Sequence, residues 1–225
     1  MFAKSFVTIL TICFASFTTL AAQRSGVGQS PWSPPRSYCD HCHHPLTWWQ
    51  LVPILGWVIQ GGHCHFCRQR ITAYDPLCEL IGGFFAWRLA GPGLFHSLLV
   101  VLVIQILIFI ASCDYFHQYL YPLSLVGLLL LPLLIPGWGF SLTGVVTALA
   151  MTGLLTITAA RWYWLGGGDV LFIAILLLTF GVEATALVIL LASLLTLIAF
   201  FHSQQKRLPF LPALCLATLI ILSTY

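Results

Sequence analysis

Charged side chains are scarce in this sequence. Only 7% of its 225 residues are Asp, Glu, Lys or Arg, whereas a water-soluble domain needs about 25% to cover its surface. Hydrophobic residues make up 60% of the chain, its mean hydropathy is +0.98, and apolar runs close to the ~20 residues of a membrane span recur along it. The composition excludes an ordinary soluble domain and predicts an all-α, polytopic membrane protein that lies in the lipid bilayer.

Two other features are lacking. The nine Lys and Arg residues leave a net charge of +3, but they are scattered and form no basic patch, so we expect no nucleic-acid partner. No internal repeat stands out in the sequence, so a transporter built from inverted repeats has no positive support.

The apolar runs divide the chain into eight expected membrane spans, with breaks at Gly91-Pro92-Gly93, Pro136-Gly137 and Gly181. We place the spans near residues 5–22, 77–90, 94–112, 120–136, 139–160, 170–181, 184–201 and 208–224. The expected parts are a first transmembrane helix at 1–22, a cysteine-rich loop at 23–76 and a membrane-embedded domain at 77–225.

The basic residues indicate which side of the membrane each loop faces. With the amino terminus outside the cell, the cytoplasmic segments are 23–76, 113–119, 161–169 and 202–207. These segments hold Arg24, Arg36, Arg68, Arg70, Arg161, Lys206 and Arg207. Only Lys4 and Arg88 fall outside, so the distribution fits the positive-inside rule and predicts a cytoplasmic cysteine loop. The alternative is that residues 1–22 form a cleaved signal peptide, which would place the cysteines outside the cell and favour disulfides.

Two CxxC pairs stand in the loop, Cys39 with Cys42 and Cys64 with Cys67. Two such pairs can supply the four thiolates of a tetrahedral zinc site, and a loop with little core of its own gains most from such a site. We therefore expect structural zinc, with disulfides or a redox pair as alternatives. The neighbouring histidines are either substitute ligands or solvated loop residues, namely His41, His43, His44, His63 and His65.

Between the pairs lies the apolar stretch "LTWWQLVPILGWVIQGG", which is too short and interrupted to cross a bilayer. Its Trp48, Trp49 and Trp57 are typical of the membrane–water interface. A hairpin buried against the spans is the other interpretation. Either arrangement keeps the loop close to the membrane.

Two aspartates fall at the same expected membrane edge. Asp114 follows the third span and Asp169 opens the sixth. Two adjacent carboxylates can share a proton, so that one activates water while the other protonates a substrate oxygen. The glycines Gly166, Gly167 and Gly168 would let a substrate backbone approach Asp169 closely. The alternative is that both aspartates only cap helices.

Taken together, these residues resemble the type IV prepilin peptidases, or prepilin leader peptidase/N-methyltransferases, including the late-competence form. "LGGGDV" is similar to the GxGD signature of that family, with Asp169 as its aspartate. Asp114, followed by an apolar residue and a proline, Pro122, is similar to the first catalytic aspartate. The family usually has a lysine where this chain has Leu171 and an acidic or amide residue where it has Leu123, and these departures bear on local loop geometry or substrate fit.

The order of the remaining motifs follows the same family. "ASF" at 15–17 is followed by Arg24, the paired CxxC motifs, and "ITAYDPLCEL" at 71–80 with its Glu79. The resemblance covers nearly the whole chain. It implies a GxGD-type aspartic endopeptidase of the bacterial plasma membrane that cleaves prepilins or pseudopilins at the cytoplasmic face. It also implies N-methylation of the new amino terminus with S-adenosylmethionine, for which the residues themselves give no independent sign.

Two functions from other classes compete with the peptidase. A proton-coupled transporter would use the aspartates as a proton relay, but it should carry them near the middle of the bilayer. A membrane thiol oxidoreductase would use the CxxC pairs, but it should expose them to an oxidising compartment or a quinone. The expected positions of the aspartates and of the loop disfavour both.

Overall fold

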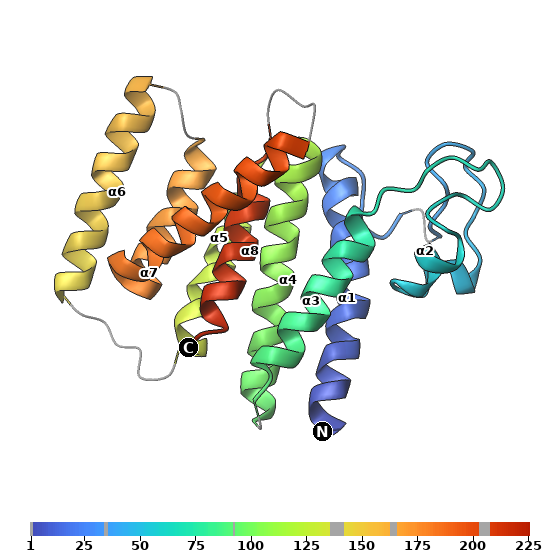
Figure 1. The fold of residues 1–225 in the computed structure, drawn as a ribbon, viewed down its shortest axis with the longest axis horizontal. Coiled ribbons are helices and arrows are strands. Elements are labelled where there is room, and N and C mark those ends of the chain that lie inside the picture. Colours follow the sequence, from blue (N-terminus) through green and yellow to red (C-terminus); the bar gives the residue numbers. More distant parts are fainter. Residues whose placement is uncertain (1, 34–35, 92, 136–141, 163–165, 203–207) are drawn as a thin grey trace. The chain divides into compact units, whose positions relative to one another are not determined.

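A computed structural model describes residues 2–33, 36–91, 93–135, 142–162, 166–202 and 208–225. Within these ranges the chain is helical, with only two isolated β-bridges in the cysteine loop, and the all-α fold class is confirmed (Figure 1). The helices are α1 (Phe2–Gly26), η1 (Trp48–Leu51), α2 (Leu55–Ile59), α3 (Tyr74–Leu89), α4 (Leu94–His117), α5 (Pro122–Gly127), η2 (Leu128–Leu134), α6 (Leu142–Trp162), α7 (Gly167–His202) and α8 (Leu211–Leu222).

Four described helical stretches are long and apolar enough to cross a membrane. They are Ala3–Gly26, Leu94–His117, Leu142–Arg161 and Gly167–Phe201. They support the membrane prediction, but they do not confirm the count of eight spans, because α5, η2 and α8 are shorter than a full span.

The helix boundaries test the expected breaks in the chain. α7 covers both the sixth and the seventh expected span, and its backbone is non-helical at Gly181 (φ 76°, ψ −178°). Figure 1 shows α7 as two segments that run in different directions. A positive φ is open to glycine at little cost, which explains why the chain bends at this residue. The expected breaks at Pro92 and at 136–137 lie outside the described residues.

The chain forms two compact units, residues 1–109 and residues 110–225, with the boundary inside α4. In the first unit α3 packs closely on α1 because its two glycines have no side chains. A Cβ on Gly83 would lie 2.7 Å from the Ile12 side chain of α1, and one on Gly82 would lie 3.6 Å from Thr11 of α1 and 3.1 Å from Ile108 of α4. Small residues at helix contacts are how membrane helices approach each other.

A half-buried glutamine, Gln105, joins α4 to α1 in the same unit. The Thr18 hydroxyl donates to Gln105 Oε1 at 2.8 Å, and Gln105 Nε2 donates to the Thr11 carbonyl at 2.9 Å. Hydrogen bonds of this kind hold helices together where apolar side chains gain nothing from leaving lipid.

Within the first unit, two carboxylates on α3 form hydrogen bonds, one to the cysteine loop and one to α1. Glu79 is only 4% exposed, and its Oε2 accepts the backbone N–H of Ile54 at 2.6 Å. Ile54 has φ +60°, a rare conformation for a β-branched residue, so this bond holds a strained turn. Near the start of α3, Asp75 accepts Gln23 Nε2 of α1 at 3.1 Å.

In the second unit α7 contacts α6, α8 and η2. Ala148 of α6 packs with Ile173 and Leu177 of α7 in a buried cluster. Phe172 of α7 and Leu214 of α8 have no exposed surface. This packing fixes the amino-terminal ends of α7 and α8 within the unit.

Candidate active site and metal centre

The four loop cysteines lie together. Their sulfur atoms are all within 4.8 Å of one another, with 3.9 Å between Cys39 and Cys67 and 4.0 Å between Cys42 and Cys64. Four sulfurs at the usual Zn–S distance of ~2.3 Å in a tetrahedron stand about 3.8 Å apart, whereas a disulfide requires ~2.05 Å. The set therefore fits a zinc ion, and all four thiols are free.

The two CxxC pairs fold as two equivalent knuckles. In the first, the Cys39 N–H donates to the His44 carbonyl at 3.0 Å and the His43 N–H donates to the Cys39 carbonyl at 2.8 Å. The second knuckle repeats both bonds, with Cys64 and Arg68 at 3.0 Å and Cys64 and Gln69 at 2.8 Å. The fifth residue of each knuckle has a positive φ, 56° at His43 and 60° at Arg68.

The second knuckle also stabilises a thiolate. Cys64 is 1% exposed, and the backbone N–H groups of Cys67 and Phe66 donate to its sulfur and lower the pKa of the Cys64 thiol to about 6. A thiolate is the form that binds a metal. The five neighbouring histidines are exposed and stand outside the cysteine cluster.

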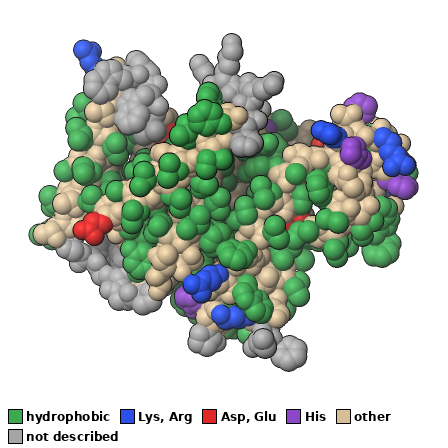
Figure 2. Space-filling view, in the orientation of Figure 1, with side chains coloured by type: hydrophobic (Ala, Val, Ile, Leu, Met, Phe, Trp, Pro, Cys, Tyr) green, Lys and Arg blue, Asp and Glu red, His purple; other side chains and the backbone are tan. Residues whose placement is uncertain are grey.

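The segment between the knuckles exposes apolar side chains. Trp48 is 81% exposed, Val58 is 57% exposed and Ile59 is 66% exposed, which excludes a hairpin that is fully buried on the described helices. Trp57 packs inward instead, with its Nε1 donating to the Ile71 carbonyl at 3.3 Å. Figure 2 shows hydrophobic side chains on one edge of the loop region and Lys, Arg and His side chains on another.

The two predicted aspartates lie at helix ends of the second unit. Asp114 is in the last turn of α4 and is half-buried. Its Oδ2 accepts the backbone N–H of Leu211, the first residue of α8, at 3.2 Å. A helix amino terminus stabilises a carboxylate through its exposed N–H groups and its dipole.

Asp169 also accepts a hydrogen bond at a helix amino terminus, in this case that of its own helix. It is half-buried in the first turn of α7, and its Oδ2 accepts the Gly166 N–H at 3.2 Å. A Cβ on Gly166 would lie 3.1 Å from this oxygen, so the absent side chain permits the bond. Both aspartates thus contact helix amino termini, as the capping interpretation expected, and both do so at helix ends rather than at mid-helix.

A glycine contact brings the two aspartate-bearing segments together. Gly168 packs on Leu120, so closely that a Cβ on Gly168 would lie 3.3 Å from the Leu120 Cβ. Leu120 follows Asp114 by six residues and Gly168 precedes Asp169 by one. Of the three glycines, Gly167 is the one with open space beside it, because a Cβ placed on it would meet no described atom within 4 Å.

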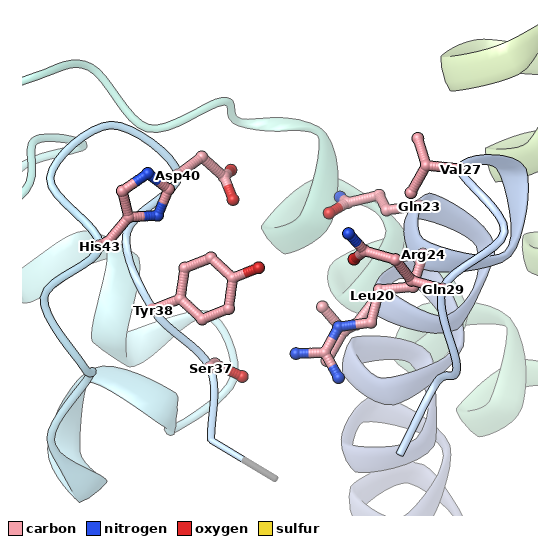
Figure 3. Close-up of a pocket in the computed structure, with 9 residues that line it drawn as sticks. All are labelled: Leu20, Gln23, Arg24, Val27, Gln29, Ser37, Tyr38, Asp40 and His43. Carbon is pink, nitrogen blue, oxygen red and sulfur yellow. The ribbon is translucent and has the colours of Figure 1, made fainter. Parts of the chain in front are cut away.

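One set of polar residues escaped the sequence analysis. Arg24, which was counted only as a cytoplasmic charge and a family motif, is 7% exposed and lines a cavity beside the first knuckle (Figure 3). The only signal in the sequence was its position at the end of an apolar run, in what the structure shows to be the last turn of α1, and a basic residue there more often reaches solvent.

Comparison with known proteins gives consistent results. The bacterial peptidase A24 N-terminal domain family matches residues 9–90, which include most of α1, both knuckles and α3. The prepilin leader peptidase/N-methyltransferase of Aeromonas hydrophila is 32% identical over 223 aligned residues, covering 88% of this chain and 75% of that protein. The enzyme of the same name from Aeromonas salmonicida (strain A449) is also 32% identical, covering 84% and 71%.

A third relative carries a different name. The type 4 prepilin-like proteins leader peptide-processing enzyme of Escherichia coli O78:H11 is 30% identical, covering 81% of this chain and 73% of that protein. No solved structure matches this chain.

Proposed function

Because this chain belongs to the prepilin leader peptidase/N-methyltransferase family, we propose that it cleaves the leader from type IV prepilins or pseudopilins and then methylates the new amino terminus. The observation that carries the peptidase proposal is the contact of Gly168 with Leu120. This contact joins the end of α4, with Asp114, to the start of α7, with Asp169.

Asp114 and Asp169 act as a carboxylate dyad that shares one proton. The ionised carboxylate removes a proton from water, and the water oxygen attacks the scissile carbonyl carbon. The protonated carboxylate donates to the carbonyl oxygen, and a proton then passes to the amide nitrogen as the C–N bond breaks. The products are a leader carboxylate and a mature chain with a free amine.

The helix ends hold this dyad in position. The Leu211 N–H at the start of α8 orients Asp114, and the Gly166 N–H before α7 orients Asp169. These bonds make the aspartates caps as well as catalysts, because a carboxylate fixed by one oxygen keeps its orientation through the reaction. Gly167, which faces open space, is where a substrate backbone approaches.

The site works at the cytoplasmic edge of the bacterial plasma membrane. A prepilin carries a basic leader ahead of an apolar helix; the basic leader stays in the cytoplasm while the helix enters the bilayer. The scissile bond is then at the inner membrane edge, where the basic residues of this chain predict the ends of α4 and α7. Thiol labelling of the exposed knuckle in intact and in opened cells tests this orientation, and labelling of intact cells would contradict it.

A structural zinc ion would be held by Cys39, Cys42, Cys64 and Cys67, whose sulfurs all lie within 4.8 Å of one another. The ion links the two knuckles and thereby stabilises the loop that Glu79 attaches to α3.

The direct test uses the full-length protein in detergent with a synthetic prepilin and S-adenosylmethionine. Mass analysis should show the free leader and a mature chain that carries one added methyl group. Intact prepilin after incubation with a folded, zinc-loaded sample would contradict the peptidase assignment. A cleaved but unmethylated product would contradict the methyl-transfer assignment alone.

A further inference from the structure

A cavity of about 270 Å³, lined by both polar and apolar side chains, lies between the carboxyl-terminal end of α1 and the first cysteine knuckle (Figure 3). Its lining residues are Leu20, Gln23, Arg24, Val27, Gln29, Ser37, Tyr38, Asp40 and His43. The volume is close to the lower limit of roughly 300 Å³ for small-molecule pockets. All lining residues belong to the first unit, and neither Asp114 nor Asp169 is among them.

The α1 side of the cavity presents a buried cation. Arg24 is 7% exposed, and its Nη1 donates to the Pro31 carbonyl at 2.8 Å. Figure 3 shows the guanidinium of Arg24 directed across the cavity toward Ser37 and Tyr38. A guanidinium has five N–H donors in a planar fork, and a carboxylate is the ligand that matches this geometry.

The knuckle side presents an anion and an aromatic ring. Figure 3 shows the Asp40 carboxylate and the Tyr38 hydroxyl directed toward the α1 side. The rings of Tyr38 and His43 lie with their centroids 5.6 Å apart. Opposite charges therefore line the two sides of a small cavity, an arrangement that suits a zwitterion with a carboxylate and cationic groups.

We propose that this cavity binds the amino-acid end of S-adenosylmethionine, an inference that rests on the methyl transfer proposed above. Arg24 binds the α-carboxylate of the donor, and Asp40 binds its α-ammonium group. The face of Tyr38 accommodates the sulfonium cation.

The reaction that this site would serve is a simple displacement. The neutral amino terminus attacks the methyl carbon, a C–N bond forms, and the C–S bond breaks with its electron pair left on sulfur. S-adenosylhomocysteine leaves as a neutral thioether, and the methylated ammonium loses one proton to water. The amine is the one that leader cleavage releases, so cleavage must come first.

The cavity depends on the metal centre. Tyr38 directly precedes Cys39, and Asp40 lies between Cys39 and Cys42, so one wall of the cavity is carried by the first knuckle. The other wall is α1. Folding of the knuckle therefore brings the anionic wall to the cationic wall, which gives the cysteine centre a role in methyl transfer.

The test measures donor binding directly. Equilibrium dialysis of the zinc-loaded, full-length protein with radiolabelled S-adenosylmethionine should show saturable binding. Arg24→Gln and Asp40→Asn should each weaken it at least ~10-fold, since each removes one partner of a charge-assisted hydrogen bond. Arg70→Gln is the matched control, because Arg70 is an exposed cation of the same loop that stands outside both knuckles and does not line the cavity.

The outcomes distinguish a failure of the proposed donor site from a failure of the proposed methyl transfer. Zinc content verifies the fold of each variant. If Arg24→Gln loses zinc, donor binding by Asp40→Asn provides the test, because Asp40 is exposed and its replacement should not disturb the fold. If the wild-type protein methylates prepilin, wild-type affinity for the donor in a zinc-loaded Asp40→Asn or Arg24→Gln variant would overturn the assignment of this cavity while methyl transfer stands. A wild-type protein that neither binds the donor nor methylates would remove the proposed methyl transfer, and this inference with it.

Discussion

The cysteine loop of the first unit and the aspartate-bearing helix ends of the second are assembled in different ways. In the loop, four cysteines within 29 consecutive positions, Cys39 to Cys67, meet with every sulfur within 4.8 Å of the others. In the second unit Asp114 and Asp169 come from two different helices, and Asp114 is bonded to the start of a third. The metal centre depends on local turns, whereas the dyad depends on how long helices pack.

The largest effect should come from the dyad. Asp114→Asn and Asp169→Asn should each lower prepilin cleavage by about 10²–10⁴-fold, because an amide keeps the shape but cannot act as the ionised base. Rates are measured by mass analysis of the product. Zinc content should be unchanged in both variants, since neither aspartate belongs to the cysteine cluster.

Glu183→Gln is the matched control for the dyad variants. Glu183 is an exposed carboxylate on α7, beyond the bend at Gly181, and its replacement should leave cleavage at the wild-type rate. An inserted Asp114→Asn protein that cleaves as fast as this control would leave the aspartates as helix caps only.

Zinc binding should be lost when one cysteine of each knuckle is replaced. Purified protein should contain about one zinc per chain, and Cys39→Ser with Cys64→Ser should remove it, because the two replacements take one ligand from each knuckle. Metal analysis gives the count, and limited proteolysis should show faster cutting within residues 39–67. Cys13→Ser, which lies in α1 away from the cluster, is the control. Two disulfides and no metal in the wild-type protein would contradict the zinc assignment.

A smaller effect should follow from pushing the two segments of the second unit apart. Gly168→Val introduces a side chain where even a Cβ would lie 3.3 Å from Leu120, so the start of α7 must shift. We expect cleavage to fall about 10-fold, since a displacement of ~1 Å can cost up to 10²-fold. Gly153→Ala on α6, where no described atom is within 4 Å of the Cβ position, should have no such effect. Equal rates for both variants would contradict the role of this contact.

The smallest effect should come from the attachment of the loop. Glu79→Leu removes the acceptor of the strained Ile54 N–H and should cost about 1–3 kcal/mol of local stability. Hydrogen exchange over residues 48–60 measures this as faster exchange. Glu79→Gln retains an acceptor oxygen and should exchange more slowly than Glu79→Leu. The same exchange in all three proteins would show that this bond does not hold the loop.

Part of this architecture could be predicted from the sequence. The CxxC spacing brought the right four cysteines together because a short loop with two pairs has few ways to arrange them, and Gly181 was identified as a bend because few other residues adopt its φ. Apolar run length identified the membrane class but not the span count, because α5, η2 and α8 are too short to be judged by length.

The rest depends on contacts that are distant in sequence. No glycine marks the positive φ at His43 or Arg68, so the equivalence of the knuckles shows only in the structure. The bond from Leu211 to Asp114 joins residues 97 positions apart. The burial of Arg24 could not be predicted for a different reason. It lies in the last turn of α1, and arginine is usually exposed at such a position.

The central claim, that Asp114 and Asp169 act as one catalytic unit, is tested most directly by a double-mutant cycle on cleavage. Residues that act together are strongly non-additive, since the loss of one already abolishes the shared step. The Asp114→Asn/Asp169→Asn protein should therefore cleave prepilin no more than a few-fold more slowly than either single variant. Losses that multiply across the cycle, in folded and zinc-loaded proteins, would show two independent carboxylates and contradict the dyad.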